Sequence, residues 1–112
     1  MMTNAERVLD ALGDPTRRLV FERLRGRTRS VQDIADGMAV SRPAVSQHLK
    51  VLKDAGLVAV RVEGTRHVYA VDTKGVEALR DWLDGFWEQT LALFKEAAES
   101  EALAEKTRGK RK

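Results

Sequence analysis

Hydrogen-bond donors recur at short intervals between residues 41 and 53 of this chain. They belong to Ser41, Arg42, Ser46, Gln47, His48, Lys50 and Lys53. Arginine can form two hydrogen bonds to guanine and glutamine two to adenine, whereas contacts to phosphate oxygens carry no sequence information. We therefore expect this segment to bind DNA. Base-edge contacts are predicted for Ser41, Arg42, Ser46 and Gln47, and phosphate contacts for Lys50 and Lys53.

These donors require a rigid element that holds them on one side. Val45, Leu49 and Leu52 follow one another at i, i+4 and i+7, which is the spacing of one buried side of a helix. Ser41 stands where a helix N-cap is expected, and Gly56 where a C-terminal cap is expected. The sequence thus predicts one short helix with a buried apolar side and an exposed polar side.

His48 lies beside the apolar side of this helix. One reading is a packed or backbone-bonded imidazole that supports the helix, and the other is a direct DNA contact. We favour the packed role and keep His48 among the candidate DNA-binding residues.

A second short helix is expected directly before this one. Ser30 and Asp33 have the spacing of a helix-capping pair, and apolar residues then recur at helical spacing as far as Met38. Two short helices joined by three or four residues, the second with a polar outer side, form the helix-turn-helix arrangement.

Two further helices are predicted at the start of the chain. The first runs from Thr3 to Leu12, with Thr3 and Glu6 at capping-box spacing. The second begins at Asp14 as its N-cap and continues to about Arg25. The residues that follow, 25–29, form a short basic loop in which Arg27 and Arg29 are candidates for phosphate contacts.

After residue 56 the apolar period changes from 3.6 to 2. Val58, Val60 and Val62 alternate with other residues, and a turn at 63–65 precedes a return strand over 66–71, so a β-hairpin is predicted. A hairpin directly after a helix-turn-helix is the winged-helix plan. The predicted wing contacts to DNA come from Arg66, near the tip of the hairpin, and from Arg61, nearer its base.

The last predicted helix runs from residue 73 to about 105, and its apolar stripe is too wide for a helix that packs only on its own small domain. An apolar patch of this size is rarely left in water, so we expect a homodimer. Trp82 and Trp87 are read as packing residues, with an inducer pocket as the alternative. The candidate dimer-interface residues are Val8, Leu12, Leu79, Leu83, Phe86, Trp87, Leu93 and Phe94.

Charge is unevenly distributed along the 112 residues, whose net charge is +3. Residues 1–72 carry +3, residues 73–105 carry −5, and residues 106–112 carry +5. We predict one domain over 1–105, mostly α-helical with a small β-hairpin wing (α+β), followed by a disordered basic tail over 106–112. That tail is either a nonspecific phosphate arm or a solubilising end. No segment is apolar enough to span a membrane and none resembles a signal peptide, which favours a cytoplasmic protein.

No catalytic or metal-binding arrangement is recognisable in the sequence. There is no cysteine, no glycine-rich phosphate loop and no nucleophile beside a base, so we expect neither an enzyme nor a cofactor. The two histidines, His48 and His67, fall in different predicted elements and form no metal-binding pair. A winged-helix module that binds another protein, with only weak DNA binding, is the alternative function.

Four segments resemble the ArsR/SmtB family of bacterial transcriptional repressors. They are 11–19 (ALGDPTRRL), 42–50 (RPAVSQHLK), 52–58 (LKDAGLV) and 61–69 (RVEGTRHVY). The resemblance covers roughly residues 6–94. It implies a winged-helix homodimer formed by the first and last helices, an operator with inverted repeats, and often repression of its own gene. It also assigns recognition-helix roles to Ser41, Arg42, Ser46, Gln47 and His48, and wing roles to Arg61, Gly64 and Arg66.

The chain lacks the metal-ligand residues that are typical of the metal-sensing members of this family. The helix before the turn has no Cys-x-Cys pair, and the last helix has no histidine. Asp81, Asp84 and Glu88 lie within two turns of that helix, where acidic residues usually form a solvated side. We therefore predict no transition-metal site. The sequence does not identify a small-molecule inducer.

Overall fold

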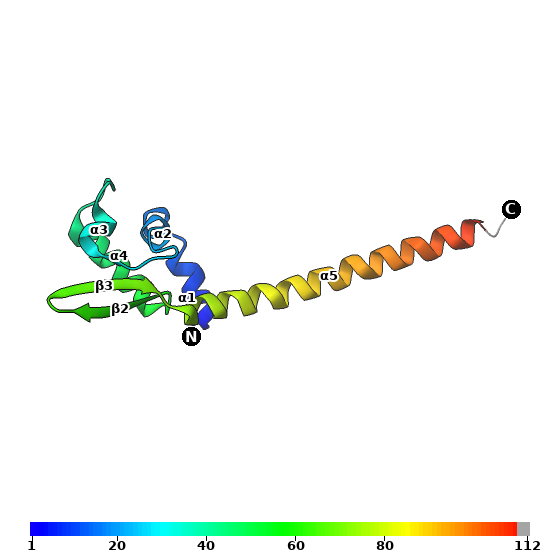
Figure 1. Cartoon of the computed structure of the whole chain (residues 1–112). Helices are drawn as coiled ribbons and strands as arrows, with labels where there is room; N and C mark the ends of the chain where they lie inside the picture. Colours follow the sequence, from blue (N-terminus) through cyan, green and yellow to red (C-terminus); the bar gives the residue numbers. More distant parts are fainter. Residues whose placement is uncertain (110–112) are drawn as a thin grey trace. The chain divides into compact units, whose positions relative to one another are not determined.

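The computed structural model describes residues 1–109, which divide into two units, 1–80 and 81–109. The elements follow the order expected for a winged helix (Figure 1). They are α1 (Asn4–Ala11), α2 (Pro15–Glu22), β1 (Arg29–Ser30), α3 (Val31–Ala35), α4 (Arg42–Asp54), β2 (Val58–Glu63), β3 (Arg66–Val71) and α5 (Thr73–Gly109). The predicted class, mostly α-helical with a β wing, is confirmed.

The first four helices begin at the residues whose side chains can cap them. Thr3 forms a complete capping box with Glu6, and Asp14, Ser30 and Ser41 each accept a hydrogen bond from the backbone N–H three residues later. Each cap satisfies a backbone N–H that the first turn of a helix leaves without a partner. These four helix starts are where the sequence predicted them.

The end of α4 is a Schellman motif. Gly56 has φ 76°, its N–H bonds the oxygen of Lys53, and the N–H of Leu57 bonds the oxygen of Leu52. The positive φ favours glycine, because a side chain is strained in this conformation. Gly56 therefore ends the helix and turns the chain into β2.

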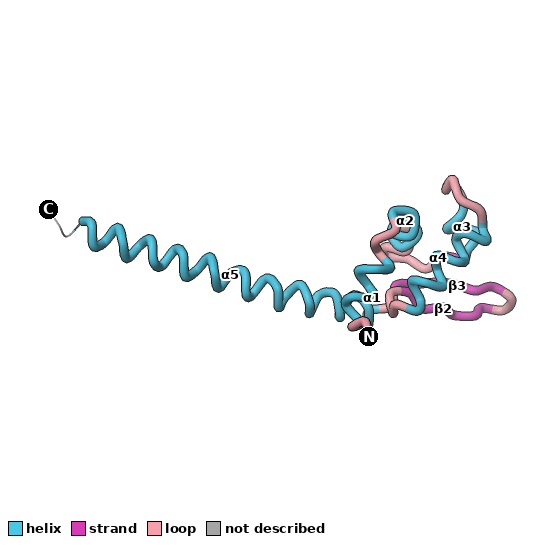
Figure 2. Tube along the Cα trace, turned by 180° about the vertical axis from the view of Figure 1, so that it is seen from behind, coloured by secondary structure: helices cyan, strands magenta, loops and turns pink. Residues whose placement is uncertain are grey.

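The wing contains one strand more than the sequence predicted. The sheet order is β1-β3-β2, and β1 pairs antiparallel with β3, placing Arg29 opposite Tyr69 and Ser30 opposite Val68. Figure 2 shows the hairpin that β2 and β3 form. The prediction that residues 25–29 form a loop was therefore wrong for Arg29. Gly64, with φ 62°, is the first residue of the two-residue turn between β2 and β3, as in a type II′ hairpin.

Two helices end about three residues earlier than predicted. α2 ends at Glu22 instead of Arg25, and α3 ends at Ala35 instead of Met38. Gly37, with φ 79°, follows the last residues of α3 and cannot continue a right-handed helix in that conformation. Met38 nevertheless packs against the core. Its apolar side chain therefore indicated a buried position, although the residue is not part of the helix.

The core of the first unit is apolar, and both its helices and its sheet contribute side chains to it. Its fully buried side chains include Val20 of α2, Leu24 in the turn after α2, Ile34 of α3 and three residues of α4, namely Val45, Leu49 and Leu52. Leu57 and Val58 close it from the side of the sheet. The three buried residues of α4 are those predicted from spacing, so the core determines which side of this helix is exposed.

The start of α5 touches the end of α4 through backbone. The N–H of Gly75 donates to the oxygen of Gly56 at 2.7 Å, and Asp72 accepts a hydrogen bond from the N–H of Lys74. A Cβ atom on Gly75 would lie 2.8 Å from that oxygen. This contact therefore requires glycine at position 75.

The second unit, residues 81–109, consists of α5 alone. The helix continues through Lys106–Gly109, so the expected disordered tail is corrected for these four residues. Lysine and arginine are good helix formers, and their charges suit the C-terminal end of a helix dipole. Residues 110–112 of the predicted tail lie outside the described residues. Among residues 1–109, no helix has both the length and the apolar character that crossing a bilayer requires.

Candidate nucleic-acid interface

The polar residues predicted to bind DNA lie outside the buried side of α4 or at its N-cap. Ser41, Arg42, Ser46, Gln47 and Lys50 are exposed. The buried side, formed by Val45, Leu49 and Leu52, is completely inaccessible to solvent. A rigid helix with exposed arginine and glutamine side chains is suited to the major groove, where base pairs present distinct donor and acceptor patterns.

His48 differs from these residues because it is half-buried. Its charge also lowers the pKa of Asp14, the N-cap of α2. The pKa of Asp14 is lowered first by the hydrogen bond from the backbone N–H of Arg17, and in smaller part by the positive charges of Arg17 and His48. His48 therefore lies near enough to α2 for its charge to act on Asp14, while its role as a packed residue or a DNA contact stays a prediction.

The turn between α3 and α4 is held by a side chain of α2. Arg23 Nη1 donates to the backbone oxygen of Asp36 at 2.8 Å. This hydrogen bond satisfies a backbone carbonyl of the turn. The turn has six residues, whereas the sequence predicted three or four. Arg23 therefore helps to position α4. The spacing of residues in the sequence did not predict this role.

The wing arginines are exposed but already paired with carboxylates. Arg61 contacts Glu63 on the same strand at 2.6 Å. Arg66 reaches Asp33 on α3, with 3.2 Å between Nη2 and Oδ2. Exposed pairs of this kind stabilise a fold by only about 0–1 kcal/mol, so a phosphate group can compete for either arginine.

The two candidate phosphate-binding arginines before α3 occupy different environments. Arg27 is exposed, whereas Arg29 is half-buried on β1 and its Nε atom has no hydrogen-bond partner within residues 1–109. Both line a polar cavity of about 340 Å³ with Thr28, Asp33 and Asp36. Arg27 is thus the freer of the two for a phosphate, while Arg29 has a structural position in the sheet.

The predicted dimer surface needs one correction. Val8 is completely buried within a single chain, so it is a core residue and not available to a partner. Its neighbour Leu9 is exposed instead. Leu12 and Leu79 are half-buried and pack against the core.

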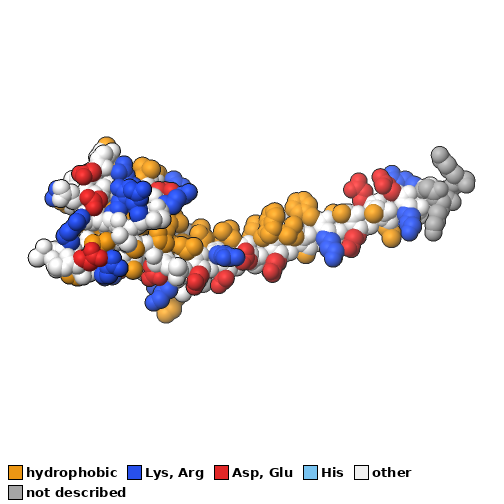
Figure 3. All heavy atoms as spheres, in the orientation of Figure 1, with side chains coloured by type: hydrophobic (Ala, Val, Ile, Leu, Met, Phe, Trp, Pro, Cys, Tyr) orange, Lys and Arg blue, Asp and Glu red, His pale blue; other side chains and the backbone are white. Residues whose placement is uncertain are grey.

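The remaining candidates lie on α5 beyond residue 80 and are exposed. Their exposed fractions are 47% for Leu83, 59% for Phe86, 57% for Trp87, 68% for Leu93 and 65% for Phe94. Trp82 stacks on Phe86 with 6.0 Å between the ring centroids. Figure 3 shows apolar side chains gathered along the upper edge of the first part of α5, with acidic and basic side chains along its lower edge. Two opposed surfaces of this kind are typical of a helix that buries one side against a partner.

Within the described residues 1–109, no three His, Asp or Glu side chains meet in a way that would hold a metal ion. That no transition metal is bound remains a prediction from the sequence.

Comparisons with known proteins give consistent matches. A family model described as a helix-turn-helix domain matches residues 12–61. The HTH-type transcriptional regulator Rv2034 of Mycobacterium tuberculosis (strain ATCC 25618 / H37Rv) is 49% identical over 96 residues, which cover 86% of this chain and 90% of that protein. The transcriptional repressor SdpR of Bacillus subtilis (strain 168) is 32% identical over 79 residues, covering 70% of this chain and 88% of that protein.

A solved structure matches the same region. It is the solution structure of the homodimeric winged helix-turn-helix DNA-binding domain of Mb0332 from Mycobacterium bovis, a possible ArsR-family transcriptional regulator. It superimposes with a TM-score of 0.61 at 30% identity, covering 79% of this chain and 82% of that one. With the exposed polar side of α4 and the wing, these similarities show that the chain belongs to the ArsR/SmtB family of winged helix-turn-helix, DNA-binding transcriptional regulators.

Proposed function

We propose that the chain acts in the cytoplasm as a homodimeric repressor of an operator with inverted repeats, its own promoter included. One α4 of the dimer enters each major-groove half-site, and the two half-sites lie about one helical turn, roughly 10 base pairs, apart. The observation that carries this proposal is the division of α4 into a fully buried apolar side and an exposed side with Arg42, Gln47 and Lys50.

The proposed contacts with DNA are of two kinds: contacts to base edges, which recognise the sequence, and contacts to phosphates, which fix the position of the protein along the duplex. Ser41, Arg42, Ser46 and Gln47 meet base edges, since they lie in the first half of the exposed side of α4. Lys50 and Arg27 bind phosphates, and Arg61 and Arg66 bring the wing against the neighbouring backbone. Gly64 lies at the tip of the wing, where a Cβ built on it would meet nothing within 4 Å, and the missing side chain lets the backbone approach the DNA closely.

Support for the dimer comes from α5 and from one solved relative. The relative from Mycobacterium bovis is described as homodimeric. The exposed apolar residues of α5, Leu83 to Phe94, form the surface that a second copy covers, and Leu9 of α1 joins them.

Footprinting and fluorescence anisotropy on DNA from upstream of the chain's own gene test this function. We expect protection of an inverted repeat and an affinity that falls steeply as the salt concentration rises. Folded protein that protects no inverted repeat, or binds all DNA equally, contradicts the proposal. A scrambled duplex of the same length and composition is the matched control.

A further inference from the structure

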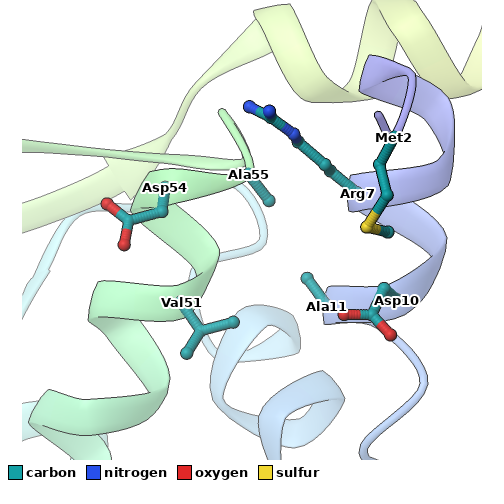
Figure 4. Close-up of a pocket in the computed structure, with 7 residues that line it drawn as sticks. All are labelled: Met2, Arg7, Asp10, Ala11, Val51, Asp54 and Ala55. Carbon is teal, nitrogen blue, oxygen red and sulfur yellow. The ribbon is translucent and has the colours of Figure 1, made fainter.

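A cleft opens between α1 and the last turn of α4. Its volume is about 230 Å³, and it is shown in Figure 4. The residues that line it are Met2, Arg7, Asp10, Ala11, Val51, Asp54 and Ala55.

The side chains around this cleft are arranged as an apolar floor beneath one cation. Ala11, Val51 and Ala55 point into the cleft, and the thioether of Met2 closes it from above α1 (Figure 4). Arg7 reaches across the mouth towards Ala55, whereas the carboxylate of Asp54 points away from the cleft. Asp10 lies at the opposite end from the guanidinium group of Arg7. The guanidinium group of Arg7 is therefore the charged group at the mouth, because the two carboxylates that also line the cleft lie away from it.

A second cavity continues the cleft towards the start of α5. It measures about 160 Å³ and shares Arg7, Asp54 and Ala55 with the first. Its other lining residues are Asn4, Gly56, Lys74 and Gly75. Lys74 thus adds a second cation, and Asn4 an amide donor, on the side where Arg7 crosses.

Neither cation of this mouth is neutralised by the protein itself. The ion pairs of the described chain, residues 1–109, involve other residues, and the side chains of Arg7 and Lys74 form no hydrogen bond there. Unpaired cations beside an apolar floor suit a ligand with an anionic head and an apolar body, since each part then meets its complement.

We propose that this cleft binds a small amphiphilic carboxylate, with its head group at Arg7 and Lys74 and its apolar body against Ala11, Val51 and Ala55. The cleft is smaller than the range of roughly 300–1,000 Å³ that is usual for drug-sized ligands, so the ligand is short, of about medium-chain length. Affinity rises about fourfold for each methylene group until the apolar floor is covered.

Occupancy of the cleft also regulates DNA binding, a step that rests on the proposed repressor function. Val51 and Ala55 belong to the same helix, and the same rigid body, as Gln47 and Lys50. A ligand wedged between α1 and the end of α4 tilts that helix away from the position in which its exposed side fits the groove. The carboxylate therefore lowers the affinity for the operator, and by linkage the operator lowers the affinity for the carboxylate by the same factor.

Methionine-methyl NMR of the full chain provides a direct test with octanoate as the probe. With all methionines carrying ¹³C-methyl groups, we expect octanoate to shift the Met2 signal saturably. The Met38 signal should stay unchanged, because Met38 packs beside the helix-turn-helix and not in this cleft. Octylamine has the same chain length and the opposite charge, and we expect it to leave Met2 unshifted.

Two substitutions at Arg7 and one matched control complete the test. Arg7→Gln should weaken octanoate binding at least tenfold, and Arg7→Glu should reverse the preference so that octylamine binds instead. Arg18→Gln removes an exposed arginine of α2 and should leave binding unchanged. Equal binding of octanoate and octylamine, equal shifts of Met2 and Met38, or unaltered binding by Arg7→Gln overturns the proposal. So does a Met2 signal that octanoate never shifts, as when a second copy of the chain covers the cleft.

The regulatory step is measured separately, by operator binding with and without octanoate at constant ionic strength. An operator affinity that octanoate leaves unchanged overturns regulation while the ligand site stands. If the protein binds no operator at all, the repressor function fails and the NMR result still decides the ligand site.

Discussion

The backbone N–H of Gly75 donates a 2.7 Å hydrogen bond to the carbonyl oxygen of Gly56, joining the start of α5 to the end of α4. A Cβ at position 75 would meet that backbone oxygen at 2.8 Å, and because a Cβ is fixed in place by its own Cα, neither atom can move cheaply. We expect Gly75→Ala to destabilise the fold by roughly 1–3 kcal/mol, the usual cost of overpacking a tight contact. Urea unfolding monitored by circular dichroism measures it.

The matched control is Gly85→Ala in the same helix. No atom lies within 4 Å of a Cβ built at Gly85. Alanine is the better helix former by about 0.5–1 kcal/mol, so this change should stabilise α5 slightly. Equal losses at positions 75 and 85 would mean that the contact with Gly56 is not the cause.

Asp14 gives a stability that depends on pH. Its pKa lies below the ordinary value of 3.8, chiefly because the backbone N–H of Arg17 donates to its carboxylate. A carboxyl group whose folded pKa is depressed stabilises the fold fully above its unfolded pKa and loses that contribution as pH falls through the folded pKa. We therefore expect the stability difference between the wild type and Asp14→Asn to be constant near pH 7 and to shrink below about pH 4.

Urea midpoints at pH 7 and pH 3 for the two proteins measure this difference. Asparagine can still cap α2, so the variant isolates the charge from the hydrogen bond. A difference that stays the same at both pH values would contradict the assigned role of the ionised carboxylate.

Gln47 and Lys50 should respond differently to replacement, although both are exposed on α4. Gln47→Ala is expected to weaken operator binding by about 1–3 kcal/mol and to leave nonspecific binding nearly unchanged, because a base contact is lost. Lys50→Ala should weaken both alike and reduce the slope of log affinity against log salt by about 1. Anisotropy titrations on operator and scrambled DNA distinguish the two. Equal losses on both DNAs for Gln47→Ala would refute the base contact.

A glutamate in the apolar side of α5 should separate the two copies of the dimer. Leu83→Glu or Phe86→Glu places a charge where a second chain is expected, and the desolvation of that charge opposes association. Sedimentation equilibrium should show monomers, and operator affinity should fall at least tenfold because one half-site is lost. Ala92→Glu adds the same charge on the other side of the helix and should remain dimeric. A dimer that persists in Leu83→Glu would place the interface elsewhere.

Local signals predicted most of the helix-turn-helix. Ser41 and Gly56 bound α4 because capping and positive φ are decided by a few neighbouring residues. The buried side of α4 followed from spacing, since only one rotation of the helix buries Val45, Leu49 and Leu52 together.

What the sequence did not predict depends on contacts between distant residues. β1 has two residues and exists because β3 pairs with it, which a local pattern cannot reveal. Val8 and Leu9 are adjacent apolar residues, and which of them faces the core depends on where α1 docks. Arg23 acts on a carbonyl thirteen positions away, and no motif marks such a bond.

Ser30 has two roles at one position: it is the last residue of β1 and the N-cap of α3. Separating β1 from β3 therefore also disturbs the hydrogen bond from the N–H of Asp33 to the Ser30 hydroxyl, which starts α3. The wing and the first helix of the helix-turn-helix should consequently open together, as one cooperative unit. In native-state hydrogen exchange, the amides of Asp33 and Val68 would then share a single opening free energy, and a protein that bends its wing to fit DNA would bend that helix with it.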